Sequence, residues 1–310
     1  MPTSLEPAPA GNQYLVSGMR FSCPRPLPLV TPDTGGDAHG TFTVTEAPLS
    51  PTPPEGAVFT TVGMAVKGQS IWGEISDLMR FRITRKGGVT IDFAPGANPL
   101  LVQHYLLGHV MGAILHLWGA LPLHASCVTR DGATIAITGR RGAGKSTLAA
   151  ALHQRGWTPV ADDVTAISSS PGGVMLAWPG QQRFRLDPQA IKTLGLNAET
   201  GVPLPQLAKR LVIPTEVRWQ PEPVRLSALI LLTNGPVTRP HLTRIAGPQA
   251  VTAIHAGTFR LQLVRPLNRD LAHAQHCLLL ARQAKVFALV RSNATEDLEA
   301  LAIAAEHAAD

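Results

Sequence analysis

Residues 133–147 read ATIAITGRRGAGKST, an apolar run followed by the pattern Gly-x-x-x-x-Gly-Lys-Ser/Thr. The glycines let successive backbone N–H groups turn toward an anion, because a Cβ would forbid the required angles. The lysine adds a positive charge, and the hydroxyl after it suits a Mg²⁺ ion. Helix formers occupy residues 147–155, and Gly156 follows them as a helix terminator. The pattern predicts a phosphate-binding loop that ends at the N-terminus of a helix.

Residues 139–147, called here the phosphate loop, are a candidate nucleotide site. The alternative is a Gly-rich turn before an ordinary helix, but such a turn does not require the Lys-Ser pair. Chance also rarely supplies both a preceding strand and a following helix. The residues expected to contact the nucleotide are Gly139, Arg140, Arg141, Gly142, Ala143, Gly144, Lys145, Ser146 and Thr147.

The composition sets outer limits on fold and partners. A chain of 310 residues exceeds the usual single core and predicts two lobes or one large α/β domain. Its 45% hydrophobic and 15% charged residues indicate a folded protein with much to bury. The net charge of +6 suits an anionic partner, but basic residues are scattered and aromatic residues make up only 5%. We therefore expect no nucleic-acid partner.

The cysteines and the first residues bear on the compartment. Cys23, Cys127 and Cys277 lie far apart without Cys-x-x-Cys spacing, which argues against a disulfide framework or a zinc site. This usage favours a reducing environment. Residues 1–13 have neither a basic start nor an apolar core, so no secretory signal is expected. The expected location is cytoplasmic.

One stretch raises the question of a membrane helix. Residues 93–129 contain no Asp, Glu, Lys or Arg, and residues 105–118 are strongly apolar. The apolar run thins out before about 20 residues, so a helix buried between two layers is the better interpretation. We expect no membrane span. Polar side chains and a helix breaker support this interpretation: Gln103, His104, His109, His116 and Pro122.

The first part of the chain is expected to be a β-rich lobe. Short strands separated by Pro and Gly are predicted at residues 14–18, 41–44, 57–62, 80–83 and 89–93. The Pro-rich residues 24–54 are expected to be mostly loop. This pattern divides the chain into an N-terminal lobe, residues 1–97, and a second domain, residues 98–310, that carries the phosphate loop.

A hairpin is predicted directly before the phosphate loop. Strands at residues 123–129 and 133–138 flank Asp131-Gly132, and Asp-Gly is a strong hairpin signal. An antiparallel neighbour beside the strand of the phosphate loop is unusual for the common doubly wound sheet. The sequence therefore predicts a variant α/β architecture.

Two adjacent carboxylates follow the predicted helix. Residues 158–167 read TPVADDVTAI, a short apolar strand that delivers Asp162 and Asp163. In phosphoryl transfer one acid holds Mg²⁺, and another accepts a proton from the attacking hydroxyl or orients it. A surface turn is the alternative.

His124 lies on the strand of the hairpin, where an imidazole is either a satisfied core residue or a group that orients an aspartate near the phosphates.

Together these segments resemble the HPr serine kinase/phosphorylase family. The order is LHAS at residues 123–126, the phosphate loop, ALHQRG at 151–156 and ADDV at 161–164. The resemblance is strong over residues 120–170. Residues 14–19 and 26–29, with 286–291 and 295–298, resemble HPr-kinase-like proteins beside peptide-modification genes, including kinases of lasso-peptide precursors. The implied fold is a phosphoenolpyruvate carboxykinase-like P-loop kinase core with a mixed sheet, in which an antiparallel strand neighbours the phosphate loop.

The resemblance also implies a site and its cofactors. The phosphate loop, with Lys145, would bind ATP, and Ser146 and Asp162 would lie near Mg²⁺. Asp163 would be the general base toward a serine hydroxyl, with His124 beside it. The resemblance does not fix which aspartate takes which role.

Arg183 and Arg185 follow the acidic pair. They are either a bidentate clamp for a phosphate or a pair of solvated charges on a strand. Four further cations are candidates to reach the nucleotide or an acidic peptide: Lys209, Arg210, Arg260 and Arg265.

Departures from the family limit what is implied. Arg140-Arg141 stand inside the phosphate loop, and the E-I-R-G and G-R-N segments of the bacterial regulator are missing. The protein is therefore expected to be a kinase that acts on a serine of a peptide or small protein. A lasso precursor is one candidate substrate, and a homo-oligomer is one candidate assembly. Two alternatives stay open: a nucleotide-binding regulatory module without transfer activity, and a small-molecule kinase.

The C-terminal half is expected to be scaffold. Residues 226–232 (LSALILL) predict a buried strand. Residues 270–285 predict a helix with a core face formed by Leu271, Ala274, Leu278 and Ala281. Thr295 is the expected N-cap of a closing helix, with Glu296 and Asp297 in its first turn.

Overall fold

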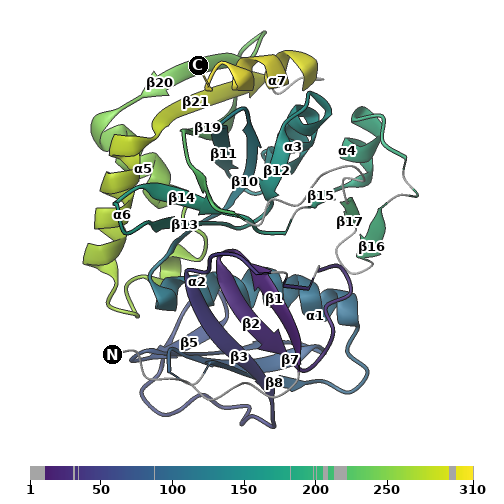
Figure 1. Cartoon of the computed structure of the whole chain (residues 1–310), viewed down its shortest axis with the longest axis vertical. Helices are drawn as coiled ribbons and strands as arrows, with labels where there is room; N and C mark the ends of the chain where they lie inside the picture. Colours follow the sequence, from purple (N-terminus) through teal and green to yellow (C-terminus); the bar gives the residue numbers. More distant parts are fainter. Residues whose placement is uncertain are drawn as a thin grey trace.

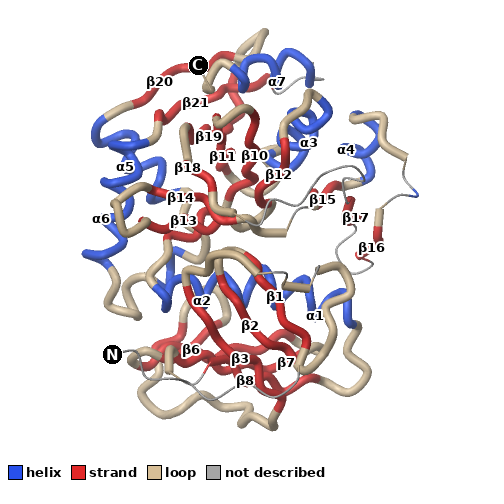
Figure 2. The backbone as a smooth tube through the Cα atoms, in the orientation of Figure 1, coloured by secondary structure: helices blue, strands red, loops and turns tan. Residues whose placement is uncertain are grey.

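The computed structural model describes residues 11–309, apart from residues 31, 34, 87, 182, 198, 200, 205–208, 213–221 and 293–297 and the side chains of residues 209–212. The protein is an α/β structure with several mixed sheets. One half is a large sheet formed by the N-terminal strands, and the other is a sheet with helices on both faces (Figures 1 and 2). A long helix lies between the two halves (Figure 1).

The N-terminal half is an eight-stranded sheet in the order β1-β2-β3-β8-β7-β6-β5-β4. Along β7, Met79, Phe81 and Ile83 are buried while Arg80 and Arg82 face outward, the period of two that a half-buried strand requires. The strands are β1 (Asn12–Val16), β2 (Met19–Cys23), β3 (Gly40–Glu46), β4 (Val58–Phe59), β5 (Met64–Lys67), β6 (Ser70–Ile75), β7 (Met79–Thr84) and β8 (Gly88–Phe93).

Four of the five predicted N-terminal strands are present, but the strand at residues 57–62 is wrong beyond β4. Three strands, β2, β5 and β6, were not predicted. The first strand ends early because Ser17 and Gly18 both have positive φ, 55° and 74°, and reverse the chain into β2. Such two-residue turns join antiparallel strands without splaying them.

The apolar stretch forms one continuous helix, Pro99–Trp118, in three parts: α1 (Pro99–Tyr105), the π-helical η1 (Leu106–Val110) and α2 (Met111–Trp118). Asn98 caps its start by accepting from the backbone of Leu100 and Leu101, and Gly119 ends it with a φ of 87°. The helix is long and apolar enough to cross a membrane, but 78% of its most apolar window is buried inside the protein. It shares a hydrophobic core with the N-terminal sheet, as the buried-helix interpretation predicts.

The phosphate loop follows a central strand of a six-stranded sheet, in the order β12-β10-β11-β19-β21-β20. β11 pairs antiparallel with β10 and parallel with β19, so the predicted antiparallel neighbour is confirmed. Asp131 and Gly132, with φ of 51° and 82°, form the hairpin turn. The strands are β10 (Ala125–Arg130), β11 (Ala133–Gly139), β12 (Thr158–Ala161), β19 (Ala228–Gly235), β20 (His241–Ile245) and β21 (Lys285–Ser292).

Helices cover both faces of this sheet (Figures 1 and 2). Ile135 and Ile137 of β11 pack on the side of α3 (Lys145–Gln154) and α7 (Leu298–Glu306). Ala136 packs in the opposite core with residues of α5 (Gly247–Ala256) and α6 (Asp270–Gln283). The predicted scaffold strand at residues 226–232 is the buried β19, and the alternation along β11 and β19 produces three layers.

Two smaller sheets complete the second half. One has the order β18-β14-β13-β9, and the other has the order β15-β17-β16. A short helix, α4 (Pro188–Thr193), follows β15. The strands are β9 (Leu121–Leu123), β13 (Thr165–Ser169), β14 (Met175–Trp178), β18 (Val224–Arg225), β15 (Phe184–Leu186), β16 (Val202–Leu204) and β17 (Lys209–Val212).

The strand predicted at residues 123–129 is wrong at its start, because His124 lies between two strands of different sheets and not on one of them, whereas the short strand predicted to deliver the two aspartates is present as β12. His124 separates β9 from β10, and Asp162-Asp163-Val164 separate β12 from β13. Since β9 pairs with β13 and β10 pairs with β12, the two breaks lie opposite one another. The chain therefore carries His124 and the acidic pair to the same point between the sheets.

The predicted core face of α6 is also wrong. Leu271 is 74% exposed and Leu278 is 45% exposed, while the buried side chains are His273, Cys277 and Leu280. The leucines therefore lie on the partly exposed side of the helix, and the side that packs against the sheet carries His273 and Cys277 instead. The predicted cap at Thr295, Glu296 and Asp297 lies outside the described residues.

Candidate active site

The phosphate loop has the backbone that its sequence predicts. Gly139, Gly142 and Gly144 have φ of 152°, 82° and 96°. A Cβ on Gly139 would lie 2.5 Å from the backbone oxygen of Leu232, and one on Gly144 would lie 2.5 Å from Nη1 of Arg291. Conformation and space both require glycine here, because side chains rarely adopt these angles.

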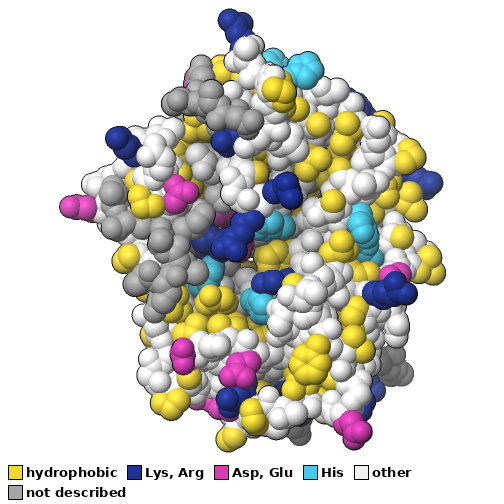
Figure 3. Space-filling view, turned by 180° about the vertical axis from the view of Figure 1, so that it is seen from behind, with side chains coloured by type: hydrophobic (Ala, Val, Ile, Leu, Met, Phe, Trp, Pro, Cys, Tyr) yellow, Lys and Arg dark blue, Asp and Glu magenta, His cyan; other side chains and the backbone are white. Residues whose placement is uncertain are grey.

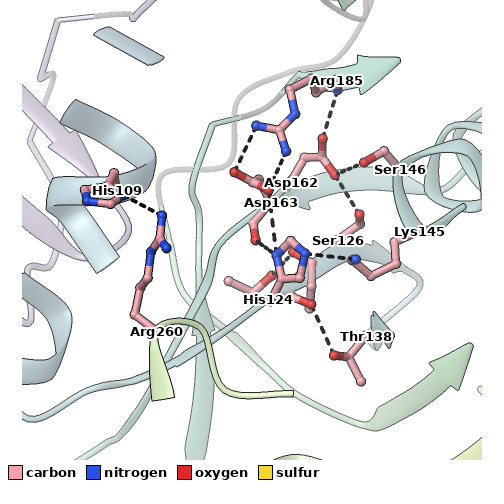
Figure 4. A network of polar contacts seen from close by, with 12 residues as sticks. His109, His124, Ser126, Thr138, Lys145, Ser146, Asp162, Asp163, Arg185 and Arg260 are labelled. Atoms are coloured by element: carbon pink, nitrogen blue, oxygen red, sulfur yellow. Dashed lines mark hydrogen bonds and ion pairs between the residues drawn. The ribbon is translucent and has the colours of Figure 1, made fainter. Parts of the chain in front are cut away.

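The loop residues divide into an exposed tip and a buried lysine. Arg140, Arg141 and Gly142 are exposed, whereas Lys145 is 7% exposed. Lys145 Nζ donates to the backbone oxygens of Gly139 at 3.1 Å and Arg140 at 3.3 Å, and it lies 3.0 Å from His124 Nε2 (Figure 4). The ammonium is therefore held at the mouth of the loop, where a phosphate would meet it.

Asp162 receives hydrogen bonds on both of its oxygens. Its Oδ1 accepts from Ser126 Oγ at 2.6 Å and from Ser146 Oγ at 2.8 Å, and its Oδ2 accepts from the backbone N–H of Arg185 at 2.9 Å (Figure 4). A carboxylate beside a loop hydroxyl is the hard-oxygen donor set that Mg²⁺ prefers. Ser146 and Asp162, predicted as metal ligands, thus lie side by side and fit the ion.

Asp163 turns the opposite way from Asp162. Its φ is 71°, in the left-handed region, and its carboxylate forms an ion pair with Arg185. Nδ1 of His124 lies 3.0 Å from the backbone oxygen of Asp163 and 3.7 Å from its Oδ1 (Figure 4). Because the backbone oxygen can only accept, Nδ1 carries the proton and Nε2 accepts from Lys145.

Burial and nearby charges tune these groups. Burial, reinforced by the charge of Lys145, lowers the pKa of His124, so its ring is neutral at neutral pH. Burial opposes the ionisation of Asp163, but the charge and the hydrogen bonds of Arg185 outweigh it and lower the pKa of the Asp163 carboxyl. The site therefore combines a neutral imidazole with an ionised aspartate.

The two predicted arginines are not solvated charges on a strand. Arg185 binds Asp163, whereas Arg183 is 6% exposed and burial lowers its pKa to about 10. Nη1 of Arg183 has no hydrogen-bond partner among the described residues. A buried, incompletely paired guanidinium near the acidic pair suits an anion, because an unsatisfied buried donor is costly.

The helix between the halves supplies residues that the sequence did not indicate. His104 Nε2 lies 3.4 Å from Nη1 of Arg185. His109 contacts the guanidinium of Arg260 (Figure 4). A Cβ on Gly108 would lie 3.7 Å from Oδ2 of Asp163, so the π-helical turn η1 lies directly against the acidic pair. Single π-turns of this kind are frequent at functional sites. Polar side chains on a charge-free helix were the available signal.

Of the other candidate cations, Arg260 belongs to the site and Arg265 is exposed. Arg260 has a φ of 53°, and its Nε is buried without a partner among the described residues. The structure gives no side-chain position for Lys209 or Arg210. In Figure 3, Lys, Arg and His side chains gather around a hollow in the middle of this face of the molecule.

No protein-family model matches the sequence, and no match is found among curated proteins.

Proposed function

We propose that this chain is an ATP- and Mg²⁺-dependent kinase that transfers a phosphoryl group to a serine hydroxyl of a peptide or small protein. We assign it to the HPr-kinase-like proteins with a phosphoenolpyruvate carboxykinase-like core, which the antiparallel pairing of β10 and β11 supports. One observation carries the proposal. Asp162 and Asp163 are adjacent in the chain, but one accepts from the phosphate-loop hydroxyl and the other faces His124 and Arg185.

We assign Asp162 to binding the metal ion next to the nucleotide. Ser146 and Asp162 would hold Mg²⁺, and Lys145 with the N–H groups of the phosphate loop would bind the phosphates of ATP. The bound ion supplies neutralisation of the charge that develops during transfer. Ser126 shares Oδ1 of Asp162 and fixes the carboxylate from the side of the hairpin.

We assign Asp163 to the serine hydroxyl that accepts the phosphoryl group. Asp163 is ionised at neutral pH and can take the proton of an attacking serine hydroxyl or orient that hydroxyl. Nδ1 of His124 donates to the backbone oxygen of Asp163 and so positions this residue. Lys145 in turn positions the imidazole by donating to its Nε2. Arg185 forms the other contact of the Asp163 carboxylate, and its positive charge would stabilise the charge that develops on the transferred group.

The surroundings suit a flexible acceptor rather than a small buried one. Gly108 of the helix Pro99–Trp118 lies against Asp163 of the second half. Lys, Arg and His side chains surround a hollow on the face of the molecule drawn in Figure 3. A peptide segment that carries a serine, such as a precursor of a modified natural product, fits this arrangement. The cytoplasm supplies the ATP that the reaction needs.

The test is transfer from labelled ATP to candidate peptides encoded beside this chain. We expect label on a peptide serine with the wild type, and nucleotide binding without transfer in Asp163→Asn. Asn tolerates the left-handed backbone of position 163, so this variant keeps the fold. Lys67→Gln, at an exposed position on β5, serves as the control that keeps transfer.

The alternatives give different outcomes. Tight ATP binding with no label on any peptide would favour a nucleotide-binding regulatory module. Label on a small molecule would favour a small-molecule kinase. Normal transfer by Asp163→Asn would remove the base role from Asp163.

A further inference from the structure

A second cluster of titratable side chains lies on the far side of the six-stranded sheet from the phosphate loop helix. His255 ends α5, and His273 and Cys277 lie one turn apart on α6. The ligand atoms of all three lie within 4.8 Å of one another. The cluster shares no residue with the proposed kinase site.

The distances approach those of a metal site. Cys277 Sγ lies 3.9 Å from Nδ1 and 3.8 Å from Nε2 of His273. Zn–S of about 2.3 Å and Zn–N of about 2.0 Å in a tetrahedral site place sulfur and nitrogen about 3.5 Å apart. The rings of His255 and His273 meet edge to face, with centroids 5.1 Å apart. Small side-chain movements would bring all three ligands around one ion.

The neighbouring hydrogen bonds prepare His273 to bind a metal. Thr258 Oγ1 donates to the backbone oxygen of Ile254 at 3.3 Å and lies 2.9 Å from His273 Nε2. Since the hydroxyl proton is used, the Thr258 oxygen accepts from Nε2–H, which leaves Nδ1 as the bare nitrogen. Metal-binding histidines almost always donate their second N–H to such a partner.

Burial divides the cluster into an inner and an outer part. Cys277 is 1% exposed and His273 is 6% exposed, whereas His255 is exposed. An ion could therefore enter past His255 and be held by the two inner ligands. A buried thiol packed against a histidine is the simpler interpretation, but it does not call for the second imidazole or for the Thr258 contact.

We propose that His255, His273 and Cys277 form a binding site for Zn²⁺ that joins α5 to α6. Two imidazoles and one thiolate are borderline and soft ligands, which select Zn²⁺ over Mg²⁺ or Ca²⁺. Water completes the fourth position on the exposed side. The spacing of the cysteines in the sequence gave no sign of this site, because one cysteine alone takes part.

Binding is balanced by release of one proton. The Cys277 thiol loses its proton to solvent when sulfur binds the ion, and the neutral imidazoles bind without proton loss. The site is close enough to the proposed kinase site to influence it. Thr258 bridges to Leu123, and the backbone oxygen of Gly257 accepts from the N–H of His124 at 2.8 Å.

The experiment titrates Co²⁺ and then Zn²⁺ into chelator-treated full-length protein. We expect one equivalent of Co²⁺ to produce a thiolate-to-metal charge-transfer band and visible d–d bands, which one equivalent of Zn²⁺ removes. Zn²⁺ should also raise the melting temperature, since it binds the folded state. Cys277→Ser should lose the charge-transfer band, and Cys127→Ser, at an equally buried cysteine of the same core, should keep it.

His255→Ala provides a second variant at an exposed position where folding is not at risk. It should weaken Zn²⁺ binding by about tenfold or more. Absence of a one-to-one complex in the wild type would overturn the proposal. So would a charge-transfer band that persists in Cys277→Ser, or unchanged Zn²⁺ affinity in His255→Ala. None of these outcomes depends on ATP or on phosphoryl transfer.

Discussion

Arg185 meets Asp163 through two parallel hydrogen bonds, Nη2 to Oδ1 at 2.7 Å and Nη1 to Oδ2 at 3.2 Å. The backbone N–H of the same arginine donates to Asp162. One residue of β15 therefore fixes both carboxylates, through its side chain and its backbone. This arrangement couples the proposed metal-binding acid to the proposed base.

Removing the guanidinium should destabilise the protein at neutral pH. In Arg185→Gln, the half-buried Asp163, whose side chain is 19% exposed, loses its main counter-charge, and we expect a loss on the order of 2 kcal/mol in the free energy of unfolding. The lowered pKa of Asp163 means that this contribution is present above its unfolded value and lost as pH falls through its folded value. Urea unfolding at neutral and at acidic pH measures both effects. Arg80→Gln, in an exposed pair with Glu74, should cost less than about 1 kcal/mol, and equal losses would contradict the prediction.

Lys145→Ala should weaken nucleotide binding by about tenfold or more, because the ammonium is the buried cation of the phosphate loop. Fluorescent ATP analogues measure the affinity. Lys192→Ala, at an exposed position in α4, is the matched control and should bind normally. Undiminished affinity in Lys145→Ala would remove the nucleotide from this loop.

Two serines that share one carboxylate oxygen should differ in their effect on magnesium. Ser146→Ala should raise the Mg²⁺ concentration needed for ATP binding by about tenfold or more, since it removes a ligand of the ion. Ser126→Ala removes the other donor to Asp162 Oδ1 and should change the Mg²⁺ requirement much less. The measurement is ATP affinity as a function of Mg²⁺. If Ser126→Ala raised the Mg²⁺ requirement more than Ser146→Ala did, the ion would lie on the side of the hairpin.

Acid should destabilise the protein through its buried histidines. Burial lowers the pKa of His116 to about 4 from its ordinary 6.5, so between these values the unfolded chain binds the extra proton. Stability therefore falls as pH falls through this window, by on the order of 1 kcal/mol per pH unit for this side chain. His116→Gln should flatten the dependence in unfolding measured across the window, and the exposed His241→Gln should leave it unchanged. An equal slope in both variants would contradict the assignment.

The phosphate loop, its hairpin and the acidic pair could be predicted because their signals are local. Glycine spacing, the Asp131-Gly132 turn and apolar runs each fix a few neighbouring residues, and the structure places them as predicted. The meeting of His124 with Asp163 depends instead on how four strands are shared between two sheets. Periodicity within one strand carries no information about that partition.

The contribution of the long helix could not be predicted for a related reason. His104 and His109 read as interruptions in an apolar run, and nothing near them in the sequence names Arg185 or Arg260 as partners. The prediction for the buried face of α6 was wrong for a different reason. The spacing of its leucines predicted that they would face the core, but the buried face of the helix carries His273 and Cys277. Tertiary packing overrode the apolar pattern at both places.

The helix Pro99–Trp118 has a consequence for the modularity of this protein. It is a 20-residue segment with the hydropathy of a transmembrane span, and the N-terminal sheet covers it. A fragment that begins after residue 97 would leave the face of this helix that packs on the sheet uncovered. The N-terminal sheet thus shields an aggregation-prone segment, and a truncated second half would need a replacement for that sheet to stay folded and dispersed.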